Sequence, residues 1–148
     1  MTLRDKLIGA WFLQSYIEYP VDGSSPSYPL GEDAKGLIIY SPDGFMSSQL
    51  MRTGRPAFAS GDWFRGTPQD YEQAGSYIAY SGPFDVDEET GTLTHSMFVS
   101  FFPNWLGQTQ IRLADLVGDI LHLGPKVPIQ SAGKSVMSKL QWRRAVTR

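Results

Sequence analysis

The sequence predicts an all-β protein: one domain over residues 1–148, folded as a single antiparallel up-and-down β-barrel with a short N-terminal helix and one short mid-chain helix. Three observations lead to this prediction. The chain has 15 Gly and 10 Pro among 148 residues, so turns are frequent. Apolar and polar residues alternate over short segments, as they do in strands. Tight turns join most of these segments, which favours antiparallel neighbours, and closing into a barrel removes exposed strand edges.

The N-terminal part of the chain gives a helical turn, a strand and a loop, in that order. Thr2–Ile8 is predicted to be helical, with the Thr2 side chain capping the turn and Asp5 placed three residues on. Trp11–Tyr19 is rich in aromatic and β-branched residues and is predicted to be a strand. Pro20–Asp33 contains three Pro and two Gly and is predicted to be a loop.

A β-hairpin follows the loop. The strands Gly36–Tyr40 and Phe45–Arg52 flank the turn Ser41-Pro42-Asp43-Gly44. In this turn Pro presets φ at the first corner, and Gly supplies the positive φ that a chain reversal requires. The two strands are therefore expected to pair antiparallel.

The segment Thr53–Gly75 interrupts the strand pattern and contains the predicted mid-chain helix, Thr67–Ala74. Thr67 is a good N-cap, Pro68 suits the first helical position, and Asp70 lies in the first turn. The helix is expected to end near Gly75.

Six more strands complete the predicted barrel, for a total of about eight to ten counted generously. They are Ser76–Ser81, Phe84–Asp87, Thr92–Phe101, Gln108–Leu116, Ile120–Leu123 and Val136–Arg144. In a small barrel alternate residues point inward.

Composition excludes several classes of protein. The net charge of −2 is not the basic balance of a nucleic-acid-binding protein. Cysteine is absent, which excludes disulfides and fits a cytoplasmic protein. The longest stretch without charged residues, Thr90–Ile111, contains Pro and Asn and is no membrane span. The phosphate-loop, dinucleotide and nucleophile-elbow motifs are missing, and His95 and His122 have no carboxylate at zinc-ligand spacing, so we expect neither a cofactor nor a metal.

His95 is the first candidate site residue. On the predicted strand Thr92–Phe101 it shares one face with four apolar residues, Leu93, Met97, Val99 and Phe101, so it is expected to point inward. Such a histidine is either a hydrogen-bonded core residue or a general acid or base in a cavity.

Arg112 and Gln110 lie two residues apart and share a face of the strand Gln108–Leu116. Both faces of this strand are mixed, so the direction of Arg112 stays open. An inward Arg112 requires a partner, either an internal carboxylate or an anionic oxygen of a substrate, because an unpaired buried cation is costly.

Several longer segments resemble the lipocalin-like domain family, the small stand-alone lipocalin-like proteins of bacteria and fungi. They are Gly9-Ala10-Trp11, Leu37–Arg52, Tyr77–Phe84, Thr94-His95, Phe102–Gly107 and Leu140–Arg144. The resemblance implies a barrel whose base is closed by Trp11, with a basic residue of the last strand across its ring. It also implies a small-molecule cavity and, for fungal members, a frequent link with natural-product biosynthesis.

The remaining candidate residues would bind or orient a ligand. Tyr80 shares parity with Ile78, Phe84 and Val86 and is expected to point inward. Met46, Ser48 and Leu50 are expected to form the cavity wall, with Gln49 on the opposite face of the same strand. Trp63 and Phe64 either cap the barrel mouth or form a small core under the Thr53–Gly75 loop. The substrate-binding candidates are Tyr40, Met46, Gln49, Met97, Gln110, Trp63 and Phe64.

Three functions remain open at this point. The leading hypothesis is a cofactor-independent isomerase, cyclase or dehydratase for a hydrophobic natural-product intermediate, in which His95 moves a proton while Arg112 and Tyr80 hold an oxygen. The alternative is a non-catalytic binder or carrier of a small apolar ligand. The third is an interaction module with a filled barrel. The aromatic loop Phe102–Trp105 further suggests a homodimer contact or a rim.

Overall fold

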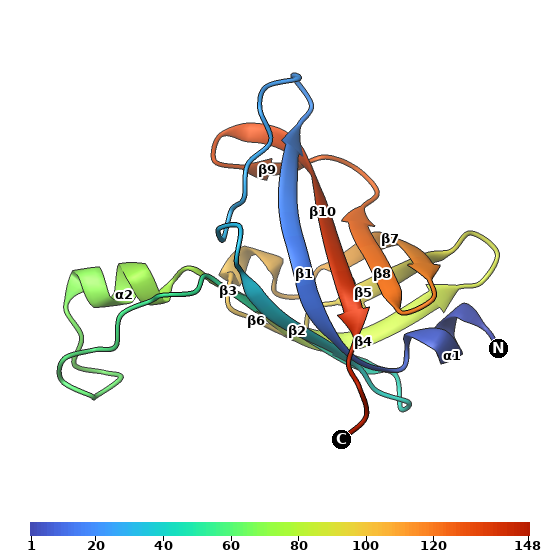
Figure 1. The fold of residues 1–148 in the computed structure, drawn as a ribbon, viewed down its shortest axis with the longest axis horizontal. Helices are drawn as coiled ribbons and strands as arrows, with labels where there is room; N and C mark the ends of the chain where they lie inside the picture. The colour runs from blue at the N-terminus through green and yellow to red at the C-terminus, as the bar shows by residue number, and fades with distance from the viewer.

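The computed structural model describes residues 1–148 as one closed barrel (Figure 1). Eight strands close it in the order β1-β2-β3-β4-β5-β7-β8-β10, and β10 pairs back with β1. All these pairs are antiparallel. The elements are α1 (Leu3–Leu7), β1 (Gly9–Pro20), β2 (Lys35–Tyr40), β3 (Phe45–Met51), α2 (Pro68–Ala74), β4 (Tyr77–Asp87), β5 (Thr92–Ser96), β6 (Val99–Ser100), the 3-10 helix η1 (Pro103–Trp105), β7 (Thr109–Val117), β8 (Ile120–Pro125), β9 (Ile129–Ser131) and β10 (Lys134–Arg144).

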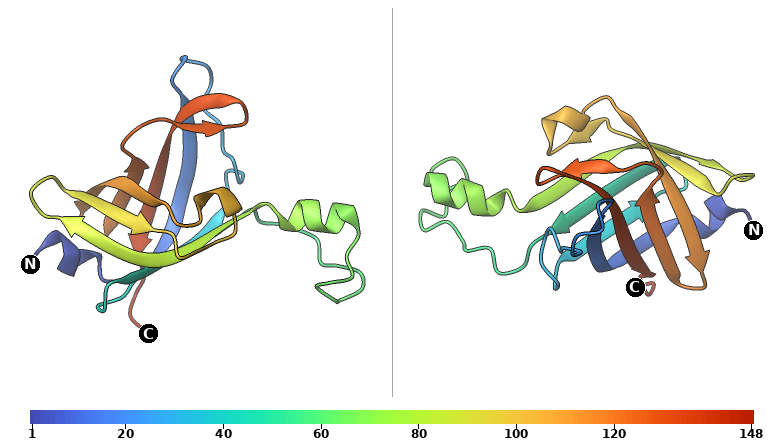
Figure 2. Two further views of the ribbon diagram at one scale, coloured as in Figure 1. Left: turned by 180° about the vertical axis from the view of Figure 1, so that it is seen from behind. Right: turned by 90° about the horizontal axis from the view of Figure 1, so that it is seen from above.

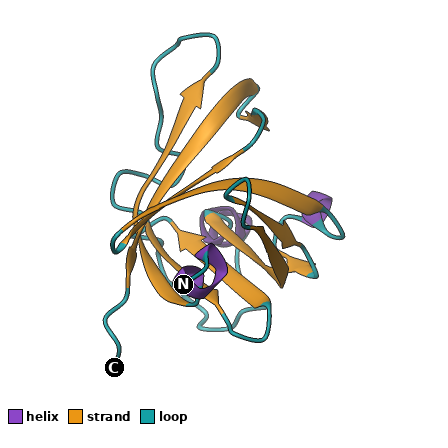
Figure 3. Cartoon of the chain, turned by 90° about the vertical axis from the view of Figure 1, so that its right-hand side faces the viewer, coloured by secondary structure: helices purple, strands orange, loops and turns teal.

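The predicted fold class is confirmed, and strands make up about half of the molecule (Figure 3). Both predicted helices are present. Thr2 and Asp5 form a capping box on α1, and Thr67 and Asp70 form another on α2. No helix is both long enough and apolar enough to cross a lipid bilayer.

Strand β4 runs unbroken where the sequence suggested two strands. We expected Gly82-Pro83 to separate Ser76–Ser81 from Phe84–Asp87, but β4 continues through both residues. Pro83 is tolerated because it lies opposite Phe45, at the end of the β3–β4 pairing, where a missing N–H costs little.

The predicted strand Thr92–Phe101 is broken after Ser96, which is the main departure from the expected pattern. Met97 is buried, but Val99 and Phe101 are more than half exposed, so the prediction that they share the inner face with His95 is wrong. At the break this segment passes close to Gly82, which has no side chain to prevent the approach. A Cβ on Gly82 would overlap the Ser96 carbonyl oxygen.

Trp11 closes one end of the barrel, as predicted. Its side chain is fully buried, and its indole N–H donates to the Leu7 carbonyl oxygen at 2.9 Å. The Arg144 guanidinium lies 4.2 Å from the centroid of the Trp11 ring. This cation–π contact joins the first and last strands at the end that α1 covers.

Residues 53–75 form an arm, called here the α2 arm, that projects away from the barrel (Figures 1 and 2). Its two ends meet where the Arg52 N–H donates to the Ser76 carbonyl oxygen at 3.0 Å. Trp63 and Phe64 lie on this arm and are 76% and 86% exposed. The arm is therefore an extension of the β3–β4 hairpin and not part of the barrel wall.

Candidate functional site

His95 is fully buried inside the barrel. It lies on β5, opposite Phe84 of β4 and Gln110 of β7. Its Nε2 atom is 2.8 Å from the hydroxyl oxygen of Tyr40, which comes from β2 on another side of the barrel. The expectation that His95 points inward is confirmed.

The environment of His95 keeps its ring neutral. Burial and, to a smaller extent, the positive charge of Arg112 together lower the pKa of His95 from 6.5 to about 3. The Nδ1 atom is buried and has no hydrogen-bond partner in the protein. Whichever tautomer is present, one ring nitrogen is therefore left without a partner, as either a donor or an acceptor.

Tyr40 and Phe84 hold the His95 ring in place. Tyr40 is 1% exposed, and its ring meets that of Phe84 edge-on, with centroids 4.9 Å apart. Burial raises the pKa of Tyr40 well above its usual value, so its phenol stays protonated. Tyr40, predicted only as an orienting ligand residue, is thus a direct partner of the imidazole.

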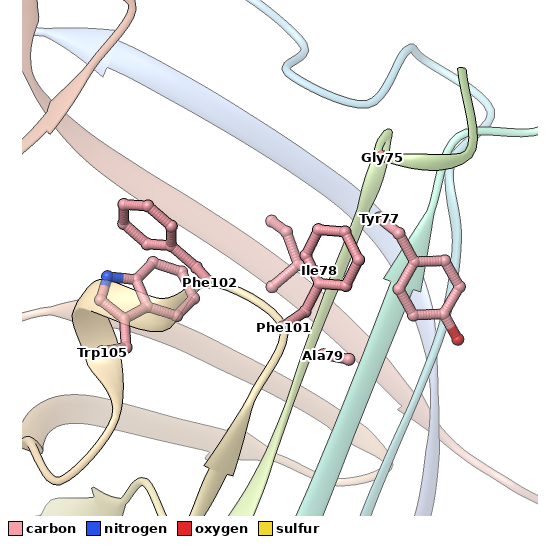
Figure 4. Close-up of a pocket in the computed structure, with 7 residues that line it drawn as sticks. All are labelled: Gly75, Tyr77, Ile78, Ala79, Phe101, Phe102 and Trp105. Carbon is pink, nitrogen blue, oxygen red and sulfur yellow. The ribbon is translucent and has the colours of Figure 1, made fainter. Parts of the chain in front are cut away.

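Tyr80 connects His95 with a pocket at the rim of the barrel. The Tyr80 ring lies 5.8 Å from that of His95 and 5.9 Å from that of Trp105, measured between centroids. Beside Trp105 is a pocket of about 270 Å³ (Figure 4). It is lined by Gly75, Tyr77, Ile78, Ala79, Phe101, Phe102 and Trp105. In Figure 4 the Ile78 side chain points toward Phe102 and Trp105, while that of Tyr77 points away from them.

A second buried polar atom lies next to Tyr80. Ser48 of β3 pairs with Tyr80, is completely buried, and its hydroxyl oxygen has no hydrogen-bond partner in the protein. Buried polar atoms are normally satisfied, but three in this protein have no hydrogen-bond partner: His95 Nδ1, Ser48 Oγ and Trp142 Nε1. A ligand or ordered water would provide the missing contacts.

Arg112 faces the barrel interior, which settles the direction that the sequence left open. It lies on β7 opposite Leu93, a buried inner-face residue of β5. Its guanidinium donates to the side-chain oxygen of Gln110, its neighbour on the same face. No carboxylate lies within 4.0 Å of the Arg112 guanidinium. The salt bridges of this protein are Arg65–Asp62 and Arg144–Asp119.

A further polar group inside the barrel was missed by the sequence reasoning. Glu18 of β1 is 4% exposed, and its carboxylate accepts hydrogen bonds from Ser131 at 2.7 Å and from Tyr16 at 3.4 Å. Burial, together with the neighbouring Glu18 charge, raises the pKa of Tyr16. The β1–β10 register shifts between Leu13 and Ser15, and such a bulge moves the following side chains to the other face. If side chains alternated from Trp11 without this bulge, Tyr16 and Glu18 would lie on the outer face of β1.

The other predicted ligand residues are apolar core residues or lie outside the barrel interior. Met46, which pairs with Tyr40, and Met97 are buried in the same hydrophobic core as Tyr40 and Tyr80. Gln49 is on the outer face of β3, where it accepts a hydrogen bond from Tyr77 and lines a surface hollow of about 510 Å³ beside β1 and β2. Trp63 and Phe64 are on the α2 arm, away from His95. The structure thus brings together five polar residues among those predicted: His95, Tyr40, Tyr80, Arg112 and Gln110.

This arrangement places an apolar pocket next to a group of polar residues in the barrel interior. The rim pocket is apolar and aromatic, while the interior below it offers a neutral imidazole, tyrosine hydroxyls and one cation. Such a combination of apolar walls with a few polar groups is typical of ligand sites. No three His, Asp or Glu side chains gather at one point in a way that could hold a metal ion.

The comparisons with known proteins give the family. The chain matches the model of the lipocalin-like domain family over residues 8–145, and it belongs to that family. A relative from Aspergillus oryzae (strain ATCC 42149 / RIB 40), named 4'-hydroxy-3'-methoxypropiophenone carrier protein, is 36% identical over 106 residues. The alignment spans 67% of this chain and 96% of the relative. No solved structure matches the chain significantly.

Proposed function

We propose that this protein is a carrier that binds a small aromatic natural-product intermediate inside its barrel. The observation that carries the proposal is the buried, unpartnered Nδ1 of His95 below an aromatic rim pocket. A ligand that enters beside Phe102 and Trp105 meets Tyr80 first and the imidazole next, since the Tyr80 ring lies between those of Trp105 and His95.

The pKa of His95 supports a carrier more than a catalyst. A general acid or base is most effective when its pKa lies near the working pH. A histidine with a pKa of about 3 is a poor base and is not protonated at neutral pH. It remains a good hydrogen-bond partner, which is what a binding site needs.

The relative points in the same direction. Its name states that it carries 4'-hydroxy-3'-methoxypropiophenone, a one-ring phenolic ketone. A molecule of this kind matches the chemistry of the site, because its ring suits the aromatic rim and its oxygens suit the polar interior. We therefore take one-ring aromatic ketones as the first class of ligand to test.

The test is a calorimetric titration with 4'-hydroxy-3'-methoxypropiophenone, followed by mass spectrometry of the recovered ligand. We expect one molecule bound per barrel and recovered unchanged. His95→Gln should weaken binding about tenfold, which corresponds to one lost buried hydrogen bond of about 1.4 kcal/mol. His122→Gln is the matched control, because His122 is exposed on the outer face of β8.

Two results would overturn the carrier proposal. Absence of binding in the wild type would remove the barrel as a site for this ligand class. Conversion of the ligand to a product, lost in folded His95→Gln, would instead favour the isomerase, cyclase or dehydratase hypothesis, in which Arg112 stabilises developing negative charge.

A further inference from the structure

Arg112 is a cation inside the barrel without an anionic partner. Its only hydrogen bond to a side chain is to the neutral Gln110 amide, and the nearest carboxylates are more than 4.0 Å away. Arg112 is only partly buried, so the free-energy cost of removing its charge from water is lower than for a fully enclosed charge. A free cation on the inner face of a binding barrel is nonetheless unusual, because buried charges are normally paired.

The internal carboxylate is already engaged elsewhere. Glu18 accepts hydrogen bonds from Ser131 and Tyr16 and makes no salt bridge. The carboxylate of Glu18 and the guanidinium of Arg112 therefore both face the barrel interior but form no salt bridge with each other. This leaves the Arg112 donors available to a third group.

Glu18 is the one carboxylate among the titratable groups around Arg112, and Ser131 and Tyr16 already donate to it. The titratable residues that face the interior with Arg112 are Tyr16 and Glu18 of β1, Tyr40 of β2, Tyr80 of β4 and His95 of β5. His95 is neutral, and the tyrosines Tyr16 and Tyr40 are held in the protonated form by burial. Glu18 forms no salt bridge with Arg112, so an occupant of the barrel is the remaining source of negative charge for the guanidinium.

We propose that Arg112 receives an acidic oxygen of the ligand, so that the barrel selects phenols or enols, which can ionise, over neutral molecules of the same shape. The inference rests on the proposed carrier function. A guanidinium presents several N–H donors to one anionic oxygen, and charge-assisted hydrogen bonds of this type are about twice as strong as neutral ones. Gln110, beside Arg112, fixes the guanidinium by accepting one of its hydrogen bonds.

The test compares 4-hydroxyacetophenone with its methyl ether, 4-methoxyacetophenone, in which one methyl group replaces the ionisable phenol proton. The ionised phenol absorbs at longer ultraviolet wavelengths than the neutral form, so its pKa in the bound state can be measured directly. We expect Arg112→Gln to raise the pKa of the bound phenol by about one unit or more relative to the wild type. Affinity for the phenolate should fall at least about tenfold, while affinity for the ether stays the same.

Arg143→Gln is the matched control, because Arg143 is an exposed arginine on the outside of β10. It removes the same charge from the chain and should leave both probes unaffected. If Arg112 has only a structural role, Arg112→Gln should change the affinity for both probes by the same factor, so that the ratio of the two affinities stays as in the wild type.

The outcomes separate this inference from the carrier proposal. If both probes bind equally well and Arg112→Gln shifts neither the affinity nor the pKa of the bound phenol, the inference is wrong and the carrier proposal stands. If neither probe binds to the wild type, both are overturned.

Discussion

Trp11 is the residue whose burial contributes most clearly to stability. It is fully buried at the closed end of the barrel and lies under the Arg144 guanidinium. Trp11→Ala should lower the free energy of unfolding by about 3–5 kcal/mol, the usual cost of a large-to-small change in a core. Trp63→Ala, a change to an exposed indole, should alter it by less than about 0.5 kcal/mol. Urea denaturation of both variants measures the difference, and equal stabilities would contradict the role of Trp11 as the plug.

His95 should make stability depend on pH. Its pKa in the folded state, about 3, lies below the value of 6.5 expected in the unfolded chain. The unfolded state therefore binds more protons between these values, so the stability that neutral His95 contributes is present above pH 6.5 and is lost as the pH falls. Between pH 7 and pH 5 this amounts to about 2 kcal/mol.

Denaturation at the two pH values measures this loss, and variants assign it. His95→Gln should lose about 2 kcal/mol less than the wild type between pH 7 and pH 5, because it has no imidazole to protonate. His122→Gln should behave like the wild type, since His122 is exposed. An unchanged pH dependence in His95→Gln would mean that His95 titrates normally in the folded protein.

At the scale of single elements, the absence of a side chain at Gly82 allows the chain to leave β5 after Ser96. A Cβ at this position would overlap the Ser96 carbonyl and lie 2.9 Å from the backbone nitrogen of Phe98. Gly82→Ala should therefore displace the segment around Met97 and cost about 1–3 kcal/mol or more, as overpacking does. Gly118→Asn is the control, because a Cβ at Gly118 meets nothing within 4 Å and Asn tolerates its positive φ of 60°. Thermal unfolding of both variants tests this, and a wild-type melting temperature for Gly82→Ala would contradict it.

The α2 arm should be dispensable for the barrel. Its ends are already joined by the Arg52–Ser76 hydrogen bond, and β3 pairs with β4 up to Met51 and Tyr77. Replacing residues 53–75 with Asn-Gly, a favoured two-residue hairpin turn, should preserve the fold. Ligand affinity should change by less than about threefold, since Trp63 and Phe64 are exposed and Gly75, which lines the rim pocket, is replaced by the Gly of the new turn. A larger loss in the calorimetric titration would show that the arm takes part in binding.

The elements that depend on local signals were predictable from the sequence. Both helix caps, the Ser41–Gly44 turn and the inward direction of His95 and Tyr80 follow from residues close together in the chain. The end of β5 at Ser96 depends on a contact with Gly82, which lies on another strand. The inward direction of Glu18 depends on a bulge in the β1–β10 pairing. Neither the end of β5 nor the direction of Glu18 is indicated by residues that are close in the sequence.

At the scale of the whole molecule, barrel closure assembles the candidate site. Tyr40 and His95 are 55 residues apart in sequence and lie on strands that are not neighbours in the sheet, yet their side chains meet. Parity predicted that both Tyr80 and His95 point inward, but only the strand order places Tyr40 against the imidazole. For the same reason the sequence could not tell that Arg112 has no carboxylate near it, because that depends on which strands face β7 across the barrel.

The homodimer stays a prediction, and one exposed apolar patch on the surface is a candidate for its interface. The segment from β6 to η1 exposes a run of large apolar side chains, Phe98, Val99, Phe101, Phe102 and Leu106, at 46–78%. An exposed apolar patch of this kind is typical of an interaction site, and a second copy of the chain would bury it in a twofold contact. We expect sedimentation velocity to give a dimer at concentrations of tens of micromolar. Phe98→Ser should shift it to monomer without changing the melting temperature of the barrel, whereas Phe45→Ser, at the β2–β3 turn, should not. A monomer in the wild type at every concentration would remove this surface as a dimer contact.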